Sequence, residues 1–80
     1  MYRIYSMVKE VSENEELLYK GLILKDFEIW NLGEEEIKII INHSQYEITL
    51  ESGEGFSMGK DETRSCVMVT EGKVKFVGKH

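Results

Sequence analysis

The clearest alternation of hydrophobic and polar positions lies in residues 36–50, EIKIIINHSQYEITL. On either side of a polar centre, hydrophobic side chains recur at every second position: Ile37, Ile39 and Ile41, then Tyr46, Ile48 and Leu50. A period of two is typical of a β-strand with one buried face. Residues 42–45 are suited to a tight turn, so we expect an antiparallel hairpin with a two-residue turn at His43 and Ser44.

Other β-rich segments precede and follow this hairpin. We expect further strands over residues 2–8, 19–24, 26–32, 56–58, 65–70 and 73–77. The last two are expected to form a second hairpin around a tight turn at Glu71 and Gly72. Turns containing glycine are expected between other strands, over residues 31–36, 51–55 and 59–63.

Local signals predict the structure outside the strands. The polar residues 9–16 are expected to form a loop. Within it, Ser12 and Glu15 have the spacing of a capping box, which favours a short helical turn over residues 12–18. Gly33 is the residue expected at positive φ in its turn. The last residues, 78–80, are expected to fray.

About eight short strands separated by turns predict an all-β fold, either a small antiparallel β-sandwich or a jelly-roll-like barrel. The 80 residues correspond to a single domain over residues 1–80. A chain this short buries only about 60–65% of the surface exposed by its unfolded form, so its margin of stability is small. Cys66 is the only cysteine, which excludes an internal disulfide. Self-association is therefore an expected source of stability.

Several expected strands carry hydrophobic residues on both faces, although a two-layer fold covers only one face of each sheet. Contiguous exposed hydrophobic residues mark protein interfaces, so we expect a homo-oligomer. The residues expected to make its contacts are Ile23, Trp30, Ile40 and Met68. Trp30 is also a candidate for stacking on a sugar, because the polar neighbours Glu28 and Asn31 indicate a partly exposed strand.

The chain is acidic, with a formal net charge of −5 and glutamates gathered in residues 13–16 and 34–36. Nucleic-acid binding depends on Lys and Arg that neutralise phosphates, so nucleic acid is not an expected partner. The same charge disfavours docking on an anionic membrane. Residues 1–11 lack the hydrophobic stretch of a secretory signal, and no hydrophobic run is long enough for a transmembrane helix. We expect a protein that is cytoplasmic in the producing cell.

No group of residues has the spacing of a catalytic or metal site. Cys66 lies in a β-rich run, where the role of a buried hydrophobic residue is expected instead of that of a nucleophile. His43 is explained by a positive φ at the hairpin tip. The acidic residues of neighbouring loops lack the spacing of a calcium loop: Glu51, Glu54, Asp61 and Glu62. The histidine motif of metal-binding cupins and the glycine spacing of a phosphate loop are also missing. We expect no enzyme activity and no cofactor.

Residues 27–78 have a distinctive order of features. A strand ending in Asn is followed by a turn, an Ile-rich strand, the corner LESGEGF at residues 50–56, a Val-rich strand and the closing VKFVG. In this order the chain resembles small β-sandwich proteins and domains encoded by tailed bacteriophages and prophages of Gram-positive hosts. The resemblance implies a virion-associated structural protein of the tail, baseplate or capsid surface. It implies no catalytic residues.

Three functions are compatible with these patterns. The preferred one is a non-enzymatic structural and interaction module that acts through self-assembly and contacts with other proteins. A small acidic phage-type inhibitor of a host protein would instead present the two glutamate runs. A carbohydrate-binding module would use Trp30 together with a tyrosine.

Overall fold

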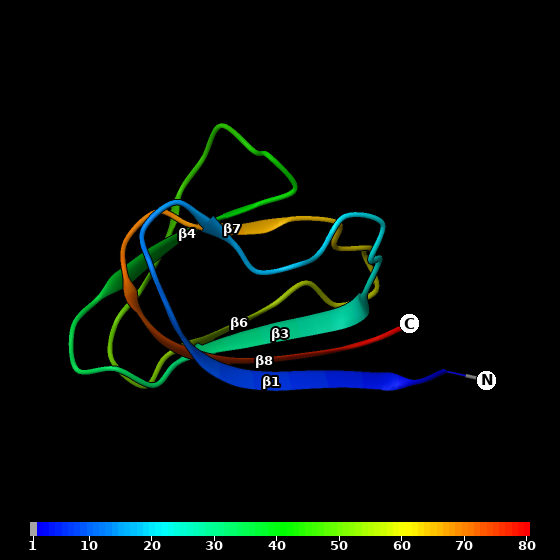
Figure 1. Cartoon of the computed structure of the whole chain (residues 1–80), viewed down its shortest axis with the longest axis horizontal. Helices are drawn as coiled ribbons and strands as arrows, with labels where there is room; N and C mark the ends of the chain where they lie inside the picture. Colours follow the sequence, from blue (N-terminus) through cyan, green and yellow to red (C-terminus); the bar gives the residue numbers. More distant parts are fainter. Residues whose placement is uncertain (1) are drawn as a thin grey trace.

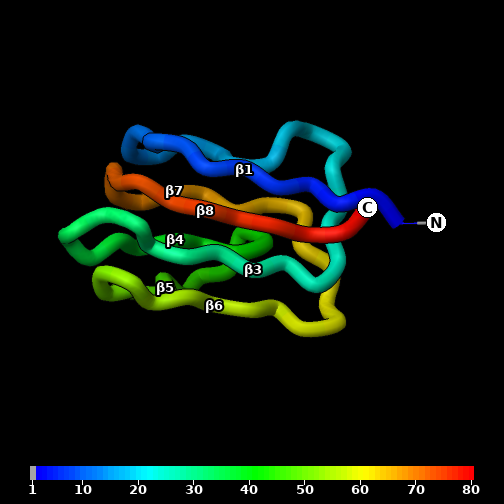
Figure 2. The backbone as a smooth tube through the Cα atoms, turned by 90° about the horizontal axis from the view of Figure 1, so that it is seen from below, coloured from blue at the N-terminus to red at the C-terminus, as the bar shows by residue number. Residues whose placement is uncertain are grey.

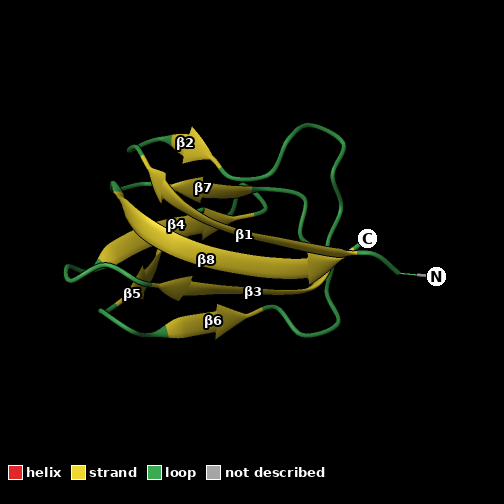
Figure 3. Ribbon diagram, turned by 60° about the horizontal axis from the view of Figure 1, so that its bottom comes forward, coloured by secondary structure: helices red, strands yellow, loops and turns green. Residues whose placement is uncertain are grey.

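The computed structural model describes residues 2–80 and contains two four-stranded antiparallel sheets packed face to face (Figure 1). Sheet A contains, in spatial order, β1 (Ile4–Val11), β8 (Gly72–Lys79), β3 (Lys25–Asn31) and β6 (Gly55–Ser57). Sheet B contains, in spatial order, β2 (Glu15–Glu16), β7 (Cys66–Met68), β4 (Ile37–Ile41) and β5 (Ile48–Leu50). Residues 2–80 form no helix, as the colouring of Figure 3 shows. The predicted all-β class is confirmed.

The strand order follows from one long antiparallel hairpin. β1 pairs with β8, β2 with β7, β3 with β6, and β4 with β5, so the tip of the hairpin lies between β4 and β5. The hairpin is rolled up, because β8 also pairs with β3 and β7 also pairs with β4. An eight-stranded double sheet connected in this way is a jelly roll, one of the two predicted architectures.

Only β4 and β5 are consecutive strands of the same sheet; every other connection in residues 2–80 passes to the opposite sheet. Figure 2 looks onto sheet A and shows β7 behind β8 and β4 behind β3. The predicted second hairpin is therefore wrong, because β7 belongs to sheet B and β8 to sheet A. Gly72 begins β8 at this crossing. A Cβ at Gly72 would lie 2.7 Å from Ile37 Cγ2, so a larger residue does not fit there.

The space between the sheets is filled by the inward-facing residues of the central strands. Their fully enclosed side chains include Phe27, Ile29, Ile39, Cys66, Met68, Val74 and Phe76. Phe76 lies in the middle of sheet A, and its ring centroid is 6.1 Å from those of both Phe27 and Tyr5. The core thus depends on residues that are far apart in the sequence.

The hairpin predicted in residues 36–50 is present as β4 and β5, but its connection is longer than two residues. The backbone turns at residues 41–44, where the Ser44 N–H donates to the Ile41 carbonyl at 3.0 Å. Asn42 and His43 have φ values of 52° and 56°, so the positive φ predicted for His43 is confirmed. Residues 45–47 then lead to β5 outside any strand.

Residues 19–24 do not form the predicted strand. Of these residues only Leu24 takes part in β pairing, through an isolated antiparallel bridge to Thr63. Upstream, the Leu22 N–H donates to the Tyr19 carbonyl at 3.0 Å in a turn where Gly21 has φ 92°. Leu22 and Leu24 are nevertheless buried, so the hydrophobic pattern marks contact with the core instead of strand pairing.

The helical turn predicted over residues 12–18 is absent. β1 continues to Val11, so the loop predicted over residues 9–16 is shorter than expected. The capping-box contact forms, because the Ser12 N–H donates to Glu15 Oε1 at 3.1 Å. The Glu15 N–H also donates to the Ser12 carbonyl at 3.3 Å, which closes a reverse turn, and β2 follows directly. Leu17 and Leu18 then enter the core.

The predicted fraying of residues 78–80 is also wrong. β8 extends to Lys79, and Arg3 and His80 exchange backbone hydrogen bonds of 2.7 and 2.9 Å. Pairing with β1 therefore holds residues 78–80 in place, and Figure 1 shows the start of β1 and the end of β8 at the same end of the sandwich.

The turn after β3 is organised by Asn31, whose side chain is fully buried. Its Nδ2 donates to the carbonyls of Glu35 at 2.8 Å and Leu50 at 3.0 Å, and its Oδ1 accepts from the Gly33 N–H at 2.9 Å. Gly33 does not adopt the predicted positive φ. One amide side chain thus ties sheet A to the loop before β4 and to the end of β5.

Candidate functional site

The longest free sheet edge in residues 2–80 belongs to β1. The four edge strands are β1 and β6 in sheet A and β2 and β5 in sheet B. β1 has 8 residues, whereas β2 has 2 and β5 and β6 have 3 each. Natural proteins protect sheet edges by short length, bulges, proline or charge. β1 is long, pairs with β8 without a register shift and contains no proline.

The backbone of β1 presents unpaired hydrogen-bonding groups on its open side. Arg3 and His80 exchange two backbone hydrogen bonds, so the odd-numbered positions of β1 bond to β8. The N–H and C=O groups of Ile4, Ser6 and Val8 therefore point away from β8. A second extended strand can bond to this row of donors and acceptors.

Hydrophobic side chains accompany these backbone groups. Ile4 is 63% exposed and Val8 is 54% exposed, on the outer face of sheet A. The alternate residues Tyr5 and Met7 are half-buried and pack against the core. Figure 3 shows β1 lying along the margin of sheet A. The candidate functional site is therefore this edge, which we call the β1 edge and define by Ile4, Ser6, Val8 and their outward backbone groups.

Sequence reasoning did not single out the β1 edge. The alternation in residues 2–8 indicated a strand, and the structure confirms one. Whether a strand lies in the middle of a sheet or at its margin depends on distant partners, here β8. No local signal could have marked Ile4 or Val8 as contact residues.

The margin of sheet B next to β1 is occupied by internal contacts. Lys9 Nζ lies 2.7 Å from Glu15 Oε2 and joins β1 to β2. This hydrogen bond, and then the one from the Ser12 N–H, lowers the pKa of the Glu15 carboxyl. The Glu16 carboxylate accepts from the Cys66 N–H at 2.8 Å and from the Ser65 hydroxyl. These two members of the first glutamate run therefore stabilise the fold.

Of the four predicted contact residues, Met68 and Ile40 lie on sheet B and Ile23 lies at the end of the sandwich. The prediction for Met68 is wrong. The Met68 side chain is fully buried in the core, so it has no surface with which to contact a second chain. The outward positions beside it belong to Val67 and Val69, which are half-buried. Ile40 is half-buried and lies opposite Val67 in the pairing of β4 with β7. Ile23 is also half-buried, and it lines a pocket near the termini.

The fourth predicted contact residue, Trp30, lies on the outer face of sheet A. A Cβ on Gly55 would come 2.5 Å from Trp30 Cδ1, so the glycine makes room for the indole. Lys75 Nζ lies 5.8 Å from the ring centroid, within the range of a cation–π interaction. Trp30 is half-buried by these neighbours. Its contacts stabilise sheet A whether or not it meets a ligand.

Two pockets lie at opposite ends of the sandwich. Near the termini, a pocket of about 380 Å³ is lined by aromatic, hydrophobic and basic residues, among them Tyr2, Tyr19, Ile23, Lys25 and Lys79. Lys79 also lies 3.3 Å from the carboxylate of Asp26. Lys25 Nζ lies 6.0 Å from the centroid of the Tyr2 ring. Neither lysine is buried, so neither is a buried charged group that could orient a ligand in this pocket.

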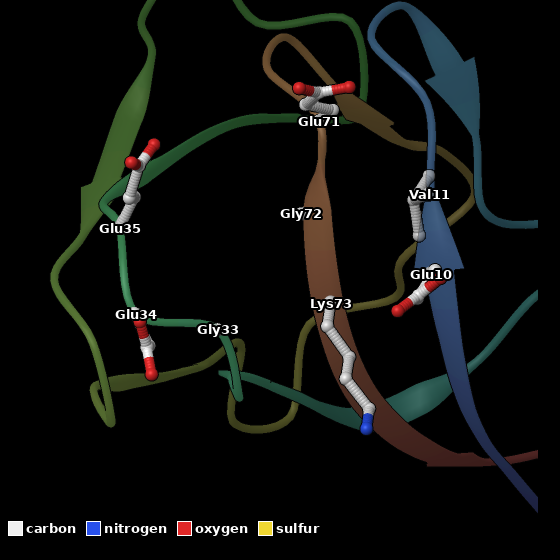
Figure 4. Close-up of a pocket in the computed structure, with 8 residues that line it drawn as sticks. All are labelled: Glu10, Val11, Gly33, Glu34, Glu35, Glu71, Gly72 and Lys73. Atoms are coloured by element: carbon white, nitrogen blue, oxygen red, sulfur yellow. The ribbon is translucent and has the colours of Figure 1, made fainter.

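The pocket at the other end, of about 330 Å³, is acidic (Figure 4). Its charged lining consists of four glutamates and one lysine: Glu10, Glu34, Glu35, Glu71 and Lys73. Excess carboxylates at this end disfavour phosphate groups. Within residues 2–80, no three His, Cys, Asp or Glu side chains gather so as to hold a metal ion. In the same part of the chain there is no helix that could span a membrane.

Cys66 is enclosed in the core, and burial, followed by the nearby Glu16 charge, raises the pKa of its thiol to about 12. We expect native protein at mildly alkaline pH to resist a thiol-specific reagent, and urea-unfolded protein to react at once. An unfolded thiol ionises near about pH 8.5. Between that pH and about 12 the thiol ionises only in the unfolded state, so the free energy of unfolding is expected to fall as pH rises. A colorimetric thiol assay checks the first expectation, and rapid labelling of folded protein would contradict it.

Comparison with known proteins provides no relative from which a function could be transferred. No family model, curated protein or solved structure matches the chain. The functional argument therefore depends on the geometry of the β1 edge.

Proposed function

We propose that this protein is a non-enzymatic structural and interaction module that self-assembles by adding a strand to the β1 edge. The observation that carries the proposal is the combination of unpaired backbone groups with exposed Ile4 and Val8 on the one long edge of residues 2–80. Strand addition satisfies the backbone groups and removes the hydrophobic side chains from water. The small core of an 80-residue domain gains stability from such association.

The architecture and the sequence both favour a role in a virion. Jelly rolls recur in viral capsid and lectin domains, although a fold alone does not determine function. Residues 27–78 also resemble small β-sandwich proteins of tailed bacteriophages. We therefore propose a virion-associated building block of the tail, baseplate or capsid surface, made in the cytoplasm of the producing cell.

Replacing Val8 with Lys is expected to weaken self-association at least about tenfold, because burial of a Val contributes about 1.5–3 kcal/mol and lysine disfavours edge pairing. Light scattering coupled to size exclusion, over a series of micromolar concentrations, measures the association. Tyr46→Lys is the matched control, because Tyr46 is 70% exposed in a loop away from β1. This variant has the same added charge and is expected to associate like the wild type.

A wild-type protein that stays monomeric at high micromolar concentration would contradict the proposed self-assembly. Equal association of Val8→Lys and wild type would show that another surface is responsible. Both variants change exposed side chains, so circular dichroism is expected to show an unchanged β-sheet spectrum.

A further inference from the structure

We propose that the partner strand is β1 of a second copy, paired antiparallel about a two-fold axis that passes between the two Ser6 residues. This inference rests on the proposed function and adds its symmetry and register. The two copies of sheet A would then form one continuous eight-stranded sheet with both outer faces on the same side. A closed two-fold dimer also uses up the β1 edge, so it does not lead to open-ended fibres.

The spacing of the outward backbone groups restricts the register. Only even-numbered positions present N–H and C=O groups on the open side, so even positions must lie opposite even positions. With Ser6 opposite its own copy, Ile4 lies opposite Val8 of the partner subunit, and this contact occurs twice. A shift by one pair in one direction would place Ser6 opposite Val8 and leave Ile4 against the carboxylate of Glu10. A shift in the other direction would place Ile4 opposite Ser6 and leave Val8 opposite Tyr2, which lies outside β1. Hydrophobic cross-strand pairing therefore favours the Ser6 register.

The one pair of like charges that this register creates can be compensated. Arg3 takes part in no ion pair among residues 2–80. In the Ser6 register it lies opposite Lys9 of the partner subunit, whose ammonium is already held by Glu15 at 2.7 Å within its own copy. A carboxylate accepts several hydrogen bonds, so Arg3 can share that Glu15. Antiparallel pairing thus brings an unpaired cation of each copy to the acidic β2 margin of the other.

The space beside β1 is compatible with a partner. The connection from β2 to β3 leaves β2 in the layer of sheet B and crosses to the start of β3 near the termini, whereas β1 lies in the layer of sheet A (Figure 1). Tyr19, from that connection, packs on the inner side of β1, with its ring centroid 6.2 Å from that of Tyr5. Within residues 2–80, no backbone group bonds to the outward N–H and C=O groups of Ile4, Ser6 and Val8.

Cysteine cross-linking of the full chain tests the register. Directly opposed, hydrogen-bonded residues of antiparallel strands have Cα atoms about 5.5 Å apart, within the range that a disulfide bridges. Ser6→Cys is therefore expected to form disulfide-linked dimers at least about tenfold faster than Ser57→Cys, because pairing raises the effective concentration of the two thiols. Ser57 is the matched control because it is exposed on β6, the opposite edge of sheet A. The buried native Cys66 is not expected to compete.

Non-reducing electrophoresis after mild oxidation gives the readout, and light scattering of the reduced variants reports association. Fast linkage of Ser6→Cys, with none for Ile4→Cys alone, supports the antiparallel two-fold dimer. Association that Val8→Lys abolishes but Ser6→Cys does not trap would overturn the register while leaving strand addition intact. Self-linkage of Ile4→Cys would place the two Ile4 residues opposite each other and overturn the proposed Ser6 register. Monomeric reduced Ser6→Cys without linkage would overturn both this inference and the proposed self-assembly.

Discussion

Replacing Asn31 with Asp is expected to lower the free energy of unfolding by about 3–5 kcal/mol at neutral pH. Asn31 is fully buried and donates to two backbone carbonyls while it accepts from the Gly33 N–H. An ionised carboxylate has the same shape but no hydrogen to donate, so it would face two carbonyl oxygens without compensation. Urea unfolding followed by circular dichroism, at a fixed protein concentration, measures the loss.

The pH dependence of this variant distinguishes an electrostatic cause from a packing defect. Burial beside two carbonyls is expected to raise the pKa of the new carboxyl above its unfolded value of about 3.9. Below that value the group is neutral in both states, so the loss relative to wild type is smallest. Between that value and the raised folded pKa, the carboxyl ionises only in the unfolded state, so the loss grows as pH rises. Above the folded pKa the loss is complete. A loss that stays constant with pH would contradict this explanation.

Asn42→Asp is the matched control for Asn31→Asp. Asn42 also donates to a carbonyl, that of Glu62 at 2.9 Å, and accepts from the backbone N–H of Arg64 at 2.7 Å. It is exposed, so water can compensate for a lost donor. We expect a loss of about 1 kcal/mol or less. Equal losses for the two variants would show that burial is not what makes Asn31 important.

Replacing Phe76 with Ala is expected to lower the free energy of unfolding by about 3–5 kcal/mol. Phe76 has no solvent exposure, and its ring packs between those of Tyr5 and Phe27. Its removal leaves a cavity in the middle of sheet A, where the flanking strands cannot move inward without breaking their pairing. A domain of this size has a total stability of only about 4–12 kcal/mol, so the expected loss is a large part of that total.

Two milder variants allow the prediction to be tested even if Phe76→Ala is too unstable to measure. Phe76→Leu retains most of the volume and is expected to lose about 1–1.5 kcal/mol. Phe56→Ala removes the same ring from the short edge strand β6, where Phe56 is only half-buried, and a loss below about 3 kcal/mol is expected. Urea midpoints of the three proteins give the ranking. A Phe56 variant that is less stable than the Phe76 variant would show that the centre of the core lies elsewhere.

The sequence was sufficient for the fold class because strand periodicity is a local property. The alternation of Ile37, Ile39 and Ile41 identifies their buried face correctly. The path between the sheets was not predictable in the same way. A Glu-Gly turn has the same composition whether the chain returns to its own sheet or crosses to the other, so β7 and β8 were mistaken for a hairpin. Residues 19–24 show a similar ambiguity, because burial alone does not require strand pairing.

The candidate site was less accessible to sequence reasoning than the fold. Ile40 and Trp30 were correctly expected on outer faces, because each alternates with buried neighbours. Met68 was placed on the wrong face, since Cys66, Val67, Met68 and Val69 are all hydrophobic and their pattern has no polar side to orient it. The β1 edge could not be recognised in the sequence, because it exists only where β1 is the outermost strand of its sheet. The strand order is determined by pairings between the two ends of the chain.

The pairing of β1 with β8 has a consequence for biosynthesis. During translation the first strand leaves the ribosome long before the strand that completes its sheet. Until then its hydrophobic face and both of its edges are open to other nascent chains. Folds dominated by pairings between distant segments also form slowly, over milliseconds to seconds. The rolled hairpin therefore leaves β1 prone to aggregation until β8 has been made.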